Sequence, residues 1–236
     1  RFRIENIGME IIMTVCSSQS IERLTPLYSE LDNKYCKAYG KERPYMDFLM
    51  NGRVYGVISS ATADMMEKDV ECEEKYFYVI NLIQANIKKN LRKSYKSLVN
   101  RRDGIIFSPT IKNLKELHLK VSGRKTRSDE TWDIQQEMID VGEGFVVELY
   151  KEGTLLSAAF FMKNQWSCYY ACAASIKGVN SHPVIWAAIE YCKAEGLERF
   201  ELGEKLEGTE KEKNISMFKA GFGAKLEKRL VEKEML

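Results

Sequence analysis

The 236-residue sequence contains no apolar run long enough to cross a bilayer, so we expect no integral membrane segment. Its two histidines, His118 and His182, are isolated, and none of its six cysteines belongs to a Cys-x-x-Cys pair. Metal sites in proteins need clustered ligands, and we therefore expect no metal ion. The formal net charge is only +2, so bulk charge argues neither for nor against a nucleic-acid partner.

The scattered cysteines carry information about the redox environment. Cys168 and Cys172 are the closest pair, but four residues along a strand span roughly 13 Å, which is too far for a disulfide. Free thiols in a core are typical of a reducing compartment. We therefore expect a cytoplasmic protein.

A break in composition divides the chain near residue 75. Asp64 to Glu74 form an acidic patch in which Lys68 is the only base. A strand is expected directly after it, from Tyr76 to Leu82. We therefore expect one unit in residues 1–75 and a second in residues 76–236.

The segment from Gln84 to Asn100 is expected to form a two-faced helix. Its apolar stripe consists of Ile83, Ile87, Leu91, Ser94 and Leu98. The other face carries Lys88, Lys89, Arg92, Lys93 and Lys96, with no acid among them. One interpretation is an ordinary solvated face, and the other is contact with a polyanion. The missing acids favour the polyanion, because a solvated helix normally alternates its charges.

The middle of the chain predicts two helices and an antiparallel meander. The first helix runs from Ile111 to Val121 and stops at Gly123, and Ser128 caps the second. Between them lies a basic loop, Arg124 to Arg127. The expected strands of this part are 104–108, 144–150, 155–162 and 166–174.

The last part of the chain predicts a strand–helix–strand–helix–strand unit. Pro183 opens a helix with Ser181 or His182 as its cap, and a strand follows at 199–202. Thr209 and Glu212 form a capping box for the last helix, which stops at Gly221 before a strand at 224–230. A strand, a helix and a parallel strand in this order build a cleft at the strand ends.

This order of elements resembles the GNAT acyltransferase fold. The segments Phe200–Glu204 and Asn214–Gly223 are similar to the FemAB-like branch of that superfamily, whose members end in a comparable phenylalanine–lysine–x–glycine–phenylalanine–glycine sequence. Leu91–Lys96 is similar to the basic helix that opens their second GNAT unit. The resemblance covers residues 76 to 230. It implies an α/β (α+β) fold with a GNAT-like mixed sheet flanked by helices, preceded in residues 1–75 by a shortened or partial first GNAT-like unit.

The resemblance also implies an activity. FemAB-like proteins transfer an acyl group, often an aminoacyl group from aminoacyl-tRNA, to an amine of a cell-envelope saccharide or peptidoglycan precursor, and some relatives use acyl-CoA. CoA-binding GNAT units carry a glycine-rich loop between central strand and helix. The corresponding loop here, Ala174 to His182, has a single glycine, Gly178. A loop with so little glycine is not expected to approach and hold a pyrophosphate with its backbone. Both aminoacyl-tRNA and acyl-CoA stay open as donors.

Four residues are candidates for catalysis. The resemblance assigns Lys219 to developing negative charge, although a lysine in a last helical turn also complements the helix dipole. Glu201 and Glu204 are candidate bases or amine-positioning groups, the alternatives being an ion pair and a solvated loop carboxylate. Neighbouring residues of a strand face opposite sides, so only one of Tyr169 and Tyr170 can face the cleft. Tyr170 is the candidate that would reprotonate a leaving group, and the alternative is a packed aromatic residue of the strand.

The substrate-binding candidates are the basic and aromatic residues Arg92, Lys93, Lys96, Arg124, Arg127, Tyr169 and Trp132. The arginines could bind phosphate or carboxylate with two hydrogen bonds, or could belong to an ordinary exposed loop. Two rival functions remain. One is an acyl-CoA-dependent N-acetyltransferase acting on an amino sugar or small amine. The other is a non-enzymatic nucleic-acid-binding module that uses the expected helix at Lys88 to Arg102.

Overall fold

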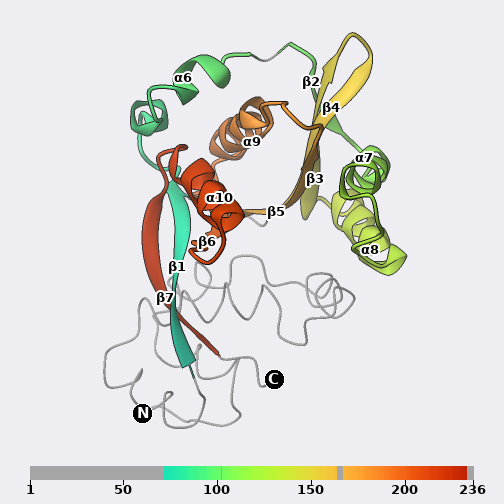
Figure 1. Ribbon diagram of the computed structural model, residues 1–236. Coiled ribbons are helices and arrows are strands. Elements are labelled where there is room, and N and C mark those ends of the chain that lie inside the picture. The colour runs from blue at the N-terminus through green and yellow to red at the C-terminus, as the bar shows by residue number, and fades with distance from the viewer. Residues whose placement is uncertain (1–71, 102, 164–166, 233–236) are drawn as a thin grey trace.

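A computed structural model describes residues 72–101, 103–163 and 167–232 (Figure 1). One seven-stranded sheet has the order β2-β3-β4-β5-β6-β1-β7. Its strands are β1 (Cys72–Asn81), β2 (Ile105–Ser108), β3 (Gly144–Lys151), β4 (Thr154–Lys163), β5 (Ser167–Ser175), β6 (Arg199–Glu204) and β7 (Lys225–Glu232). The helices are η1 (Ile87–Asn90), α6 (Tyr95–Leu98), α7 (Lys112–Ser122), α8 (Asp129–Asp140), α9 (His182–Ala194) and α10 (Glu210–Ala220).

The sheet is mixed, as expected. Strands β2 to β5 form an antiparallel meander, and β5 pairs with β6 in parallel. Strand β1 lies between β6 and β7 and is antiparallel to both. The strand predicted from Tyr76 to Leu82 is therefore interior to the sheet. The predicted unit in residues 1–75 lies almost entirely outside the described residues, and the boundary at residue 75 stays a prediction.

Helices cover both faces of the sheet (Figure 1). Helix α9 packs with the segment Ile87–Val99 on one face, in a core that includes Trp186 and Phe200. Helices α7 and α8 pack on the other face, over apolar residues of β3, β4 and β5. None of the helices in this part of the chain is long and apolar enough to cross a membrane.

Local end signals in the sequence mark the helices correctly. The Ser128 side chain accepts a hydrogen bond from the backbone N–H of Thr131. Thr209 and Glu212 form the predicted capping box at the start of α10. Gly123 ends α7 in the left-handed conformation that favours glycine. Ser181, not His182, is the N-cap residue of α9.

The predicted helix from Gln84 to Asn100 is wrong. The structure has two short pieces, η1 and α6, separated by an extended residue at Leu91. Ile83 is 68% exposed, and the buried positions are Ile87, Leu91, Tyr95 and Val99. All five basic residues of the segment are exposed, as the sequence predicts.

Contact with the C-terminal glycines explains the break in this segment. The backbone N–H of Arg92 donates to the Gly221 carbonyl over 2.9 Å, a bond that a continuous helix would give to its own turn. A Cβ added at Gly221 would overlap the Tyr95 ring. The segment therefore follows the surface of the turn after α10. We call residues 87–99 the basic segment.

Candidate functional site

The parallel strands β5 and β6 separate soon after they begin. Their register covers only three pairs, from Ser167 with Arg199 to Tyr169 with Glu201. Strand β5 continues to Ser175 and β6 to Glu204, so their carboxyl ends have left each other's hydrogen-bonding register. Ligands of α/β sheets bind at the carboxyl ends of such strands. Tyr169 and Glu201 mark the point of separation.

A β-bulge shapes the same region of β5. Phe161 is paired with Tyr170 and Phe160 with Cys172, which leaves Ala171 as the extra residue. A bulge re-aims the side chains that follow it. As a result, Tyr169 and Cys172 contribute to the same core beneath α7 and α8.

Lys219 and Tyr169 converge on Gly203. Lys219 lies in the last turn of α10, and its Nζ donates a hydrogen bond of 2.9 Å to the Glu204 carbonyl oxygen. A Cβ added at Gly203 would lie 2.9 Å from the Tyr169 hydroxyl oxygen and 3.3 Å from Lys219 Nζ. Gly203 also has φ = 86°, a conformation that glycine adopts without strain. Because Gly203 has no side chain, the Tyr169 hydroxyl and the Lys219 amino group can both lie close to it.

The environment of Lys219 changes its acidity. The side chain is only 9% exposed, and this burial lowers the pKa of Lys219 to about 8, while the charge of Glu204 opposes the shift. The lysine is therefore mostly protonated at pH 7 and exchanges its proton near neutral pH. Perturbed groups of this kind are frequent in active sites. The lysine reaches across to β6 instead of serving only its own helix end.

The two candidate glutamates are held differently. Glu201 is 0% exposed, and its carboxylate lies 3.7 Å from Nε of Arg199 on the same strand. The Glu204 carboxylate is partly exposed and lies 3.8 Å from Lys75 Nζ. The Glu204 backbone carbonyl thus accepts the hydrogen bond from Lys219, while its carboxylate lies in a partly exposed ion pair with Lys75. The role of either carboxylate as a base stays a prediction.

Tyr169, and not Tyr170, lies beside Lys219. The ring of Tyr170 packs 5.6 Å from that of Phe161 in the core beneath α9. Burial strongly raises the pKa of the Tyr170 phenol. The structure places the Tyr169 hydroxyl near Lys219 Nζ, and the catalytic role expected for Tyr170 stays a prediction.

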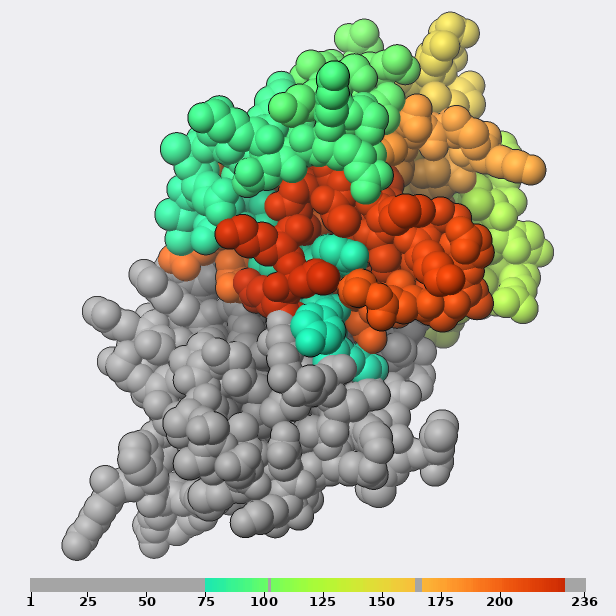
Figure 2. All heavy atoms as spheres, turned by 60° about the vertical axis from the view of Figure 1, so that its left-hand side comes forward, coloured from blue at the N-terminus to red at the C-terminus, as the bar shows by residue number. Residues whose placement is uncertain are grey.

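The basic segment lies directly on the turn that follows Lys219. The Tyr95 hydroxyl donates to the Phe218 carbonyl over 3.2 Å, and the Arg92 guanidinium lies 5.5 Å from the centre of the Tyr95 ring. In Figure 2 the teal and green atoms of residues near 90–100 border the red atoms of the C-terminal elements. Arg92, Lys93 and Lys96 are exposed there.

An aromatic cluster that the sequence analysis missed joins three elements behind this turn. The His182 ring lies 4.2 Å from that of Tyr95, 5.0 Å from Phe218 and 5.8 Å from Phe222, measured between centroids. Burial lowers the pKa of His182. The rings therefore fix the start of α9 against the end of α10. The sequence pattern does not predict these ring contacts, because the three elements are far apart in the chain.

The first turn of α9 offers few backbone donors to a ligand. The N–H groups of Val184 and Ile185 both donate to the Ser181 carbonyl, over 3.1 and 3.3 Å. Pro183 has no N–H. Phosphates that bind at helix N-termini rely on these donors.

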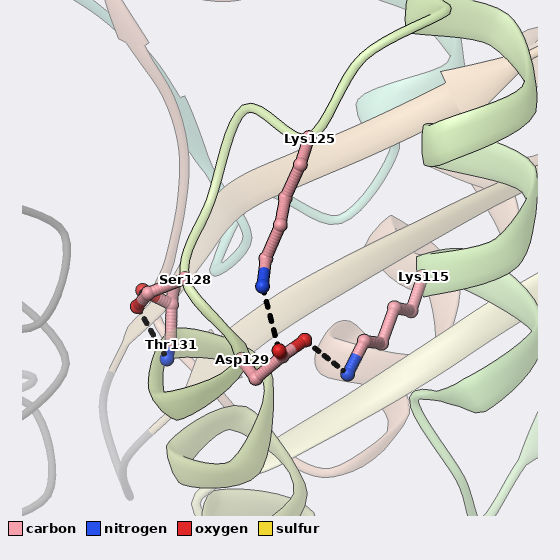
Figure 3. Close-up of polar contacts among 5 residues, drawn as sticks. All are labelled: Lys115, Lys125, Ser128, Asp129 and Thr131. Atoms are coloured by element: carbon pink, nitrogen blue, oxygen red, sulfur yellow. Dashed lines mark hydrogen bonds and ion pairs between the residues drawn. The ribbon is translucent and has the colours of Figure 1, made fainter.

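The remaining binding candidates form a second group. Arg124, Arg127 and Trp132 line one pocket between α7 and α8, together with Lys115 and Lys125. Lys115 and Lys125 both pair with Asp129 (Figure 3). The structure thus divides the binding candidates between the basic segment and this pocket, with Tyr169 at the strand separation. No cluster of three potential metal ligands occurs in the described ranges.

No family model and no curated protein sequence matches the chain. Several solved structures resemble it in fold. FemX matches with a TM-score of 0.56 and 12% identity over 74% of this chain and 69% of that one. L-PGS from Bacillus licheniformis matches with a TM-score of 0.53 and 14% identity over 76% and 67%. The C-terminal domain of a putative lysylphosphatidylglycerol synthetase from Agrobacterium fabrum matches with a TM-score of 0.52 and 16% identity over 71% and 62%.

These likenesses confirm the fold expected from the sequence. The mixed sheet flanked by helices is shared with proteins of the FemX and L-PGS type. The chain spans about two thirds of their length, from 62% to 69%.

Proposed function

We propose that this chain, which has the fold of FemX and L-PGS, is a FemAB-like N-acyltransferase. It joins an acyl or aminoacyl group to an amino group at the Lys219–Tyr169 site. The observation that carries the proposal is the convergence of the Tyr169 hydroxyl and Lys219 Nζ at Gly203, where β5 and β6 separate. The buried lysine at that place has a pKa lowered to about 8 by its burial.

The site supports the steps of acyl transfer. A neutral amine attacks the acyl carbonyl, and a tetrahedral oxyanion forms. The Lys219 ammonium group, held by the Glu204 carbonyl, stabilises that negative charge. The carbon–oxygen or carbon–sulfur bond to the donor then breaks, and the Tyr169 hydroxyl supplies a proton to the leaving oxygen or sulfur. The proton released by the attacking amine restores the phenol.

Of the two donors, we favour an aminoacyl-tRNA. The loop before α9, from Ala174 to His182, contains a single glycine, which disfavours the close backbone approach that a pyrophosphate cradle needs. The exposed basic segment lies next to the end of α10 and can neutralise a phosphate backbone. The acceptor expected from the resemblance is an amine of a saccharide or peptidoglycan precursor of the cell envelope.

Replacement of Lys219 tests the proposal. Lys219→Met keeps an unbranched side chain one atom shorter and removes the charge, and we expect transfer to fall roughly 100- to 1,000-fold, as when an oxyanion donor is lost. Lys213→Met is the matched control, because Lys213 is an exposed lysine of the same helix. Equal activity of Lys219→Met and the wild type, with both proteins folded, would contradict the proposal.

The acyl-CoA alternative has its own test. Calorimetric titration of the full chain with acetyl-CoA should show no tight, saturable binding if the donor is a charged tRNA. Saturable binding that is lost in a variant of the loop before α9, such as Asn180→Asp, whose added negative charge repels a pyrophosphate, would instead identify an acyl-CoA-dependent N-acetyltransferase acting on an amino sugar or small amine.

The non-enzymatic alternative predicts different effects for substitutions at Lys219 and in the basic segment. A nucleic-acid-binding module would bind RNA through the basic segment and would have no transfer activity to lose. Lys219→Met would then leave its function intact, whereas the pair Arg92→Glu and Lys96→Glu would abolish it. In the proposed enzyme, each change impairs transfer.

A further inference from the structure

A compact basic pocket lies at the corner where α7 ends and α8 begins. It has a volume of about 120 Å³ and is lined by side chains of both helices and of the loop 124–127 that joins them. It lies on the face of the sheet opposite to α9, because α7 and α8 cover that face. Neither the Lys219 site nor the basic segment contributes a residue to its lining.

The lining of this pocket carries an excess of positive charge. Lys115, Arg124, Lys125 and Arg127 face a single carboxylate, that of Asp129. Figure 3 shows Lys115 from α7 and Lys125 from the loop pointing at this carboxylate from two sides, at distances of 2.9 and 2.6 Å. Hydrogen bonds from Lys125 and Lys115 lower the pKa of Asp129 to about 2. The corner thus already favours a negative group strongly.

Arg127 is fixed in the wall of the pocket. One of its terminal nitrogens donates to Nε2 of His118 over 2.7 Å, so that nitrogen of the imidazole is the acceptor. The guanidinium also lies 5.5 Å from the centre of the Trp132 ring. A guanidinium held in place loses little conformational freedom when it binds an anion. Its position is therefore prepared before any ligand arrives.

Arg124 is more exposed than Arg127. Its side chain is exposed, and within the described part of the chain no carboxylate pairs with it. The buried ring of Trp132 forms an apolar part of the same lining. Low-polarity walls strengthen the attraction between the arginines and a bound anion.

We propose that the α7–α8 pocket is a second anion-binding site, which takes a phosphoryl group between Arg124 and Arg127. The two guanidinium groups hold the phosphoryl oxygens, while Asp129 keeps the two lysines in place at the rim. The site does not depend on the proposed acyl transfer and stands or fails separately from it. It also accounts for why three of the binding candidates lie away from Lys219.

Titration of the full chain with inorganic phosphate and with phenyl phosphate tests the site. Isothermal calorimetry at low salt should show saturable binding of at least one of these probes. Arg124→Gln should weaken that binding at least about tenfold, as expected for a lost charged hydrogen bond. Tighter binding of phenyl phosphate would assign the site to a phosphoryl group on a larger apolar molecule, and equal binding would assign it to the free anion.

Two variants control the experiment. Lys112→Gln removes an exposed charge from the first turn of α7, at the far end of that helix, and should leave the affinity unchanged. Lys219→Met should also leave it unchanged. Absence of saturable binding, or an equal loss in Lys112→Gln, would overturn the proposal. Loss of binding in Lys219→Met would overturn it as well, because the anion would then lie at the transfer site.

Discussion

Gly203 illustrates how one residue without a side chain can organise a reactive site. The Tyr169 hydroxyl and Lys219 Nζ occupy the space that a Cβ would need. The backbone at this position has a positive φ, which fits the end of β6 at the separation of the strands. Geometry and packing therefore both require glycine here.

Gly203→Ala should destabilise the protein and abolish transfer. The strained φ alone costs about 1–2 kcal/mol, and displacement of Tyr169 and Lys219 adds to that cost. Gly178→Ala is the matched control, because Gly178 has φ = 85° but open space around it. Urea unfolding of both variants measures the difference between them. Equal costs would show that the phenol and the lysine do not crowd position 203.

The acidity of Lys219 predicts a pH limit for activity. Its pKa of about 8 means that the ammonium form dominates below pH 8 and is lost as the pH rises through that value. If the charge stabilises the oxyanion, kcat/KM should fall above about pH 8. In Lys219→Arg the charge persists to much higher pH, so any residual activity should lack this alkaline limb. A limb that is identical in both proteins would assign the titration to another group.

Elements differ in how well the sequence predicts them. The helix ends at Ser128, Thr209 and Gly123 were predictable, because capping uses neighbours in the chain. The basic segment was predicted as one helix because its apolar residues have helical spacing. Its actual form depends on Gly221, which lies far away in the chain and accepts the hydrogen bond of Arg92.

The same distinction applies to the candidate site. Lys219 was predictable from the resemblance, and the alternation of a strand reduced the tyrosine to one of two. The bulge at Ala171 and the short register between β5 and β6 were not predictable, because they depend on pairing between strands. Without them, strand alternation alone could not show that Tyr169, and not the catalytic candidate Tyr170, lies near Lys219.

Gly221→Ala should separate the basic segment from the end of α10. The added methyl group overlaps the Tyr95 ring, and overpacking of this kind costs about 1–3 kcal/mol. In a Tyr95→Ala background the ring is gone, so Gly221→Ala should cost much less. Chemical denaturation of the two single variants and the double variant gives the coupling energy. Additive losses would mean that the ring and the glycine do not touch.

At the scale of the whole molecule, charge is balanced in number but not in position. The net charge is +2, yet the basic segment carries five exposed cations without an acid among them. Affinity for a polyanion should therefore come from one place on the surface and not from the protein's overall charge.

The salt dependence of binding measures how much of the attraction to a polyanion comes from the basic segment. For binding of a charged tRNA, the pair Arg92→Glu and Lys96→Glu should weaken affinity and make the plot of log K against log salt shallower by about one to two charges. The pair Lys112→Glu and Lys120→Glu makes the same change in net charge on exposed positions of α7 and should have little effect. Similar losses for both pairs would indicate nonspecific attraction.

The position of β1 between β6 and β7 has a consequence for the order of assembly. Strand β1 precedes the other described strands in the chain, but both of its partners follow all of them. During synthesis β1 leaves the ribosome before β2 to β5, and its pairing with β6 and β7 can form only after these two strands have emerged. Pairings between such distant segments form slowly. Among the described strands, the part of the sheet that carries Gly203 is therefore the last to be completed, so a nascent chain acquires the Lys219–Tyr169 site only after the meander of β2 to β5 has been made.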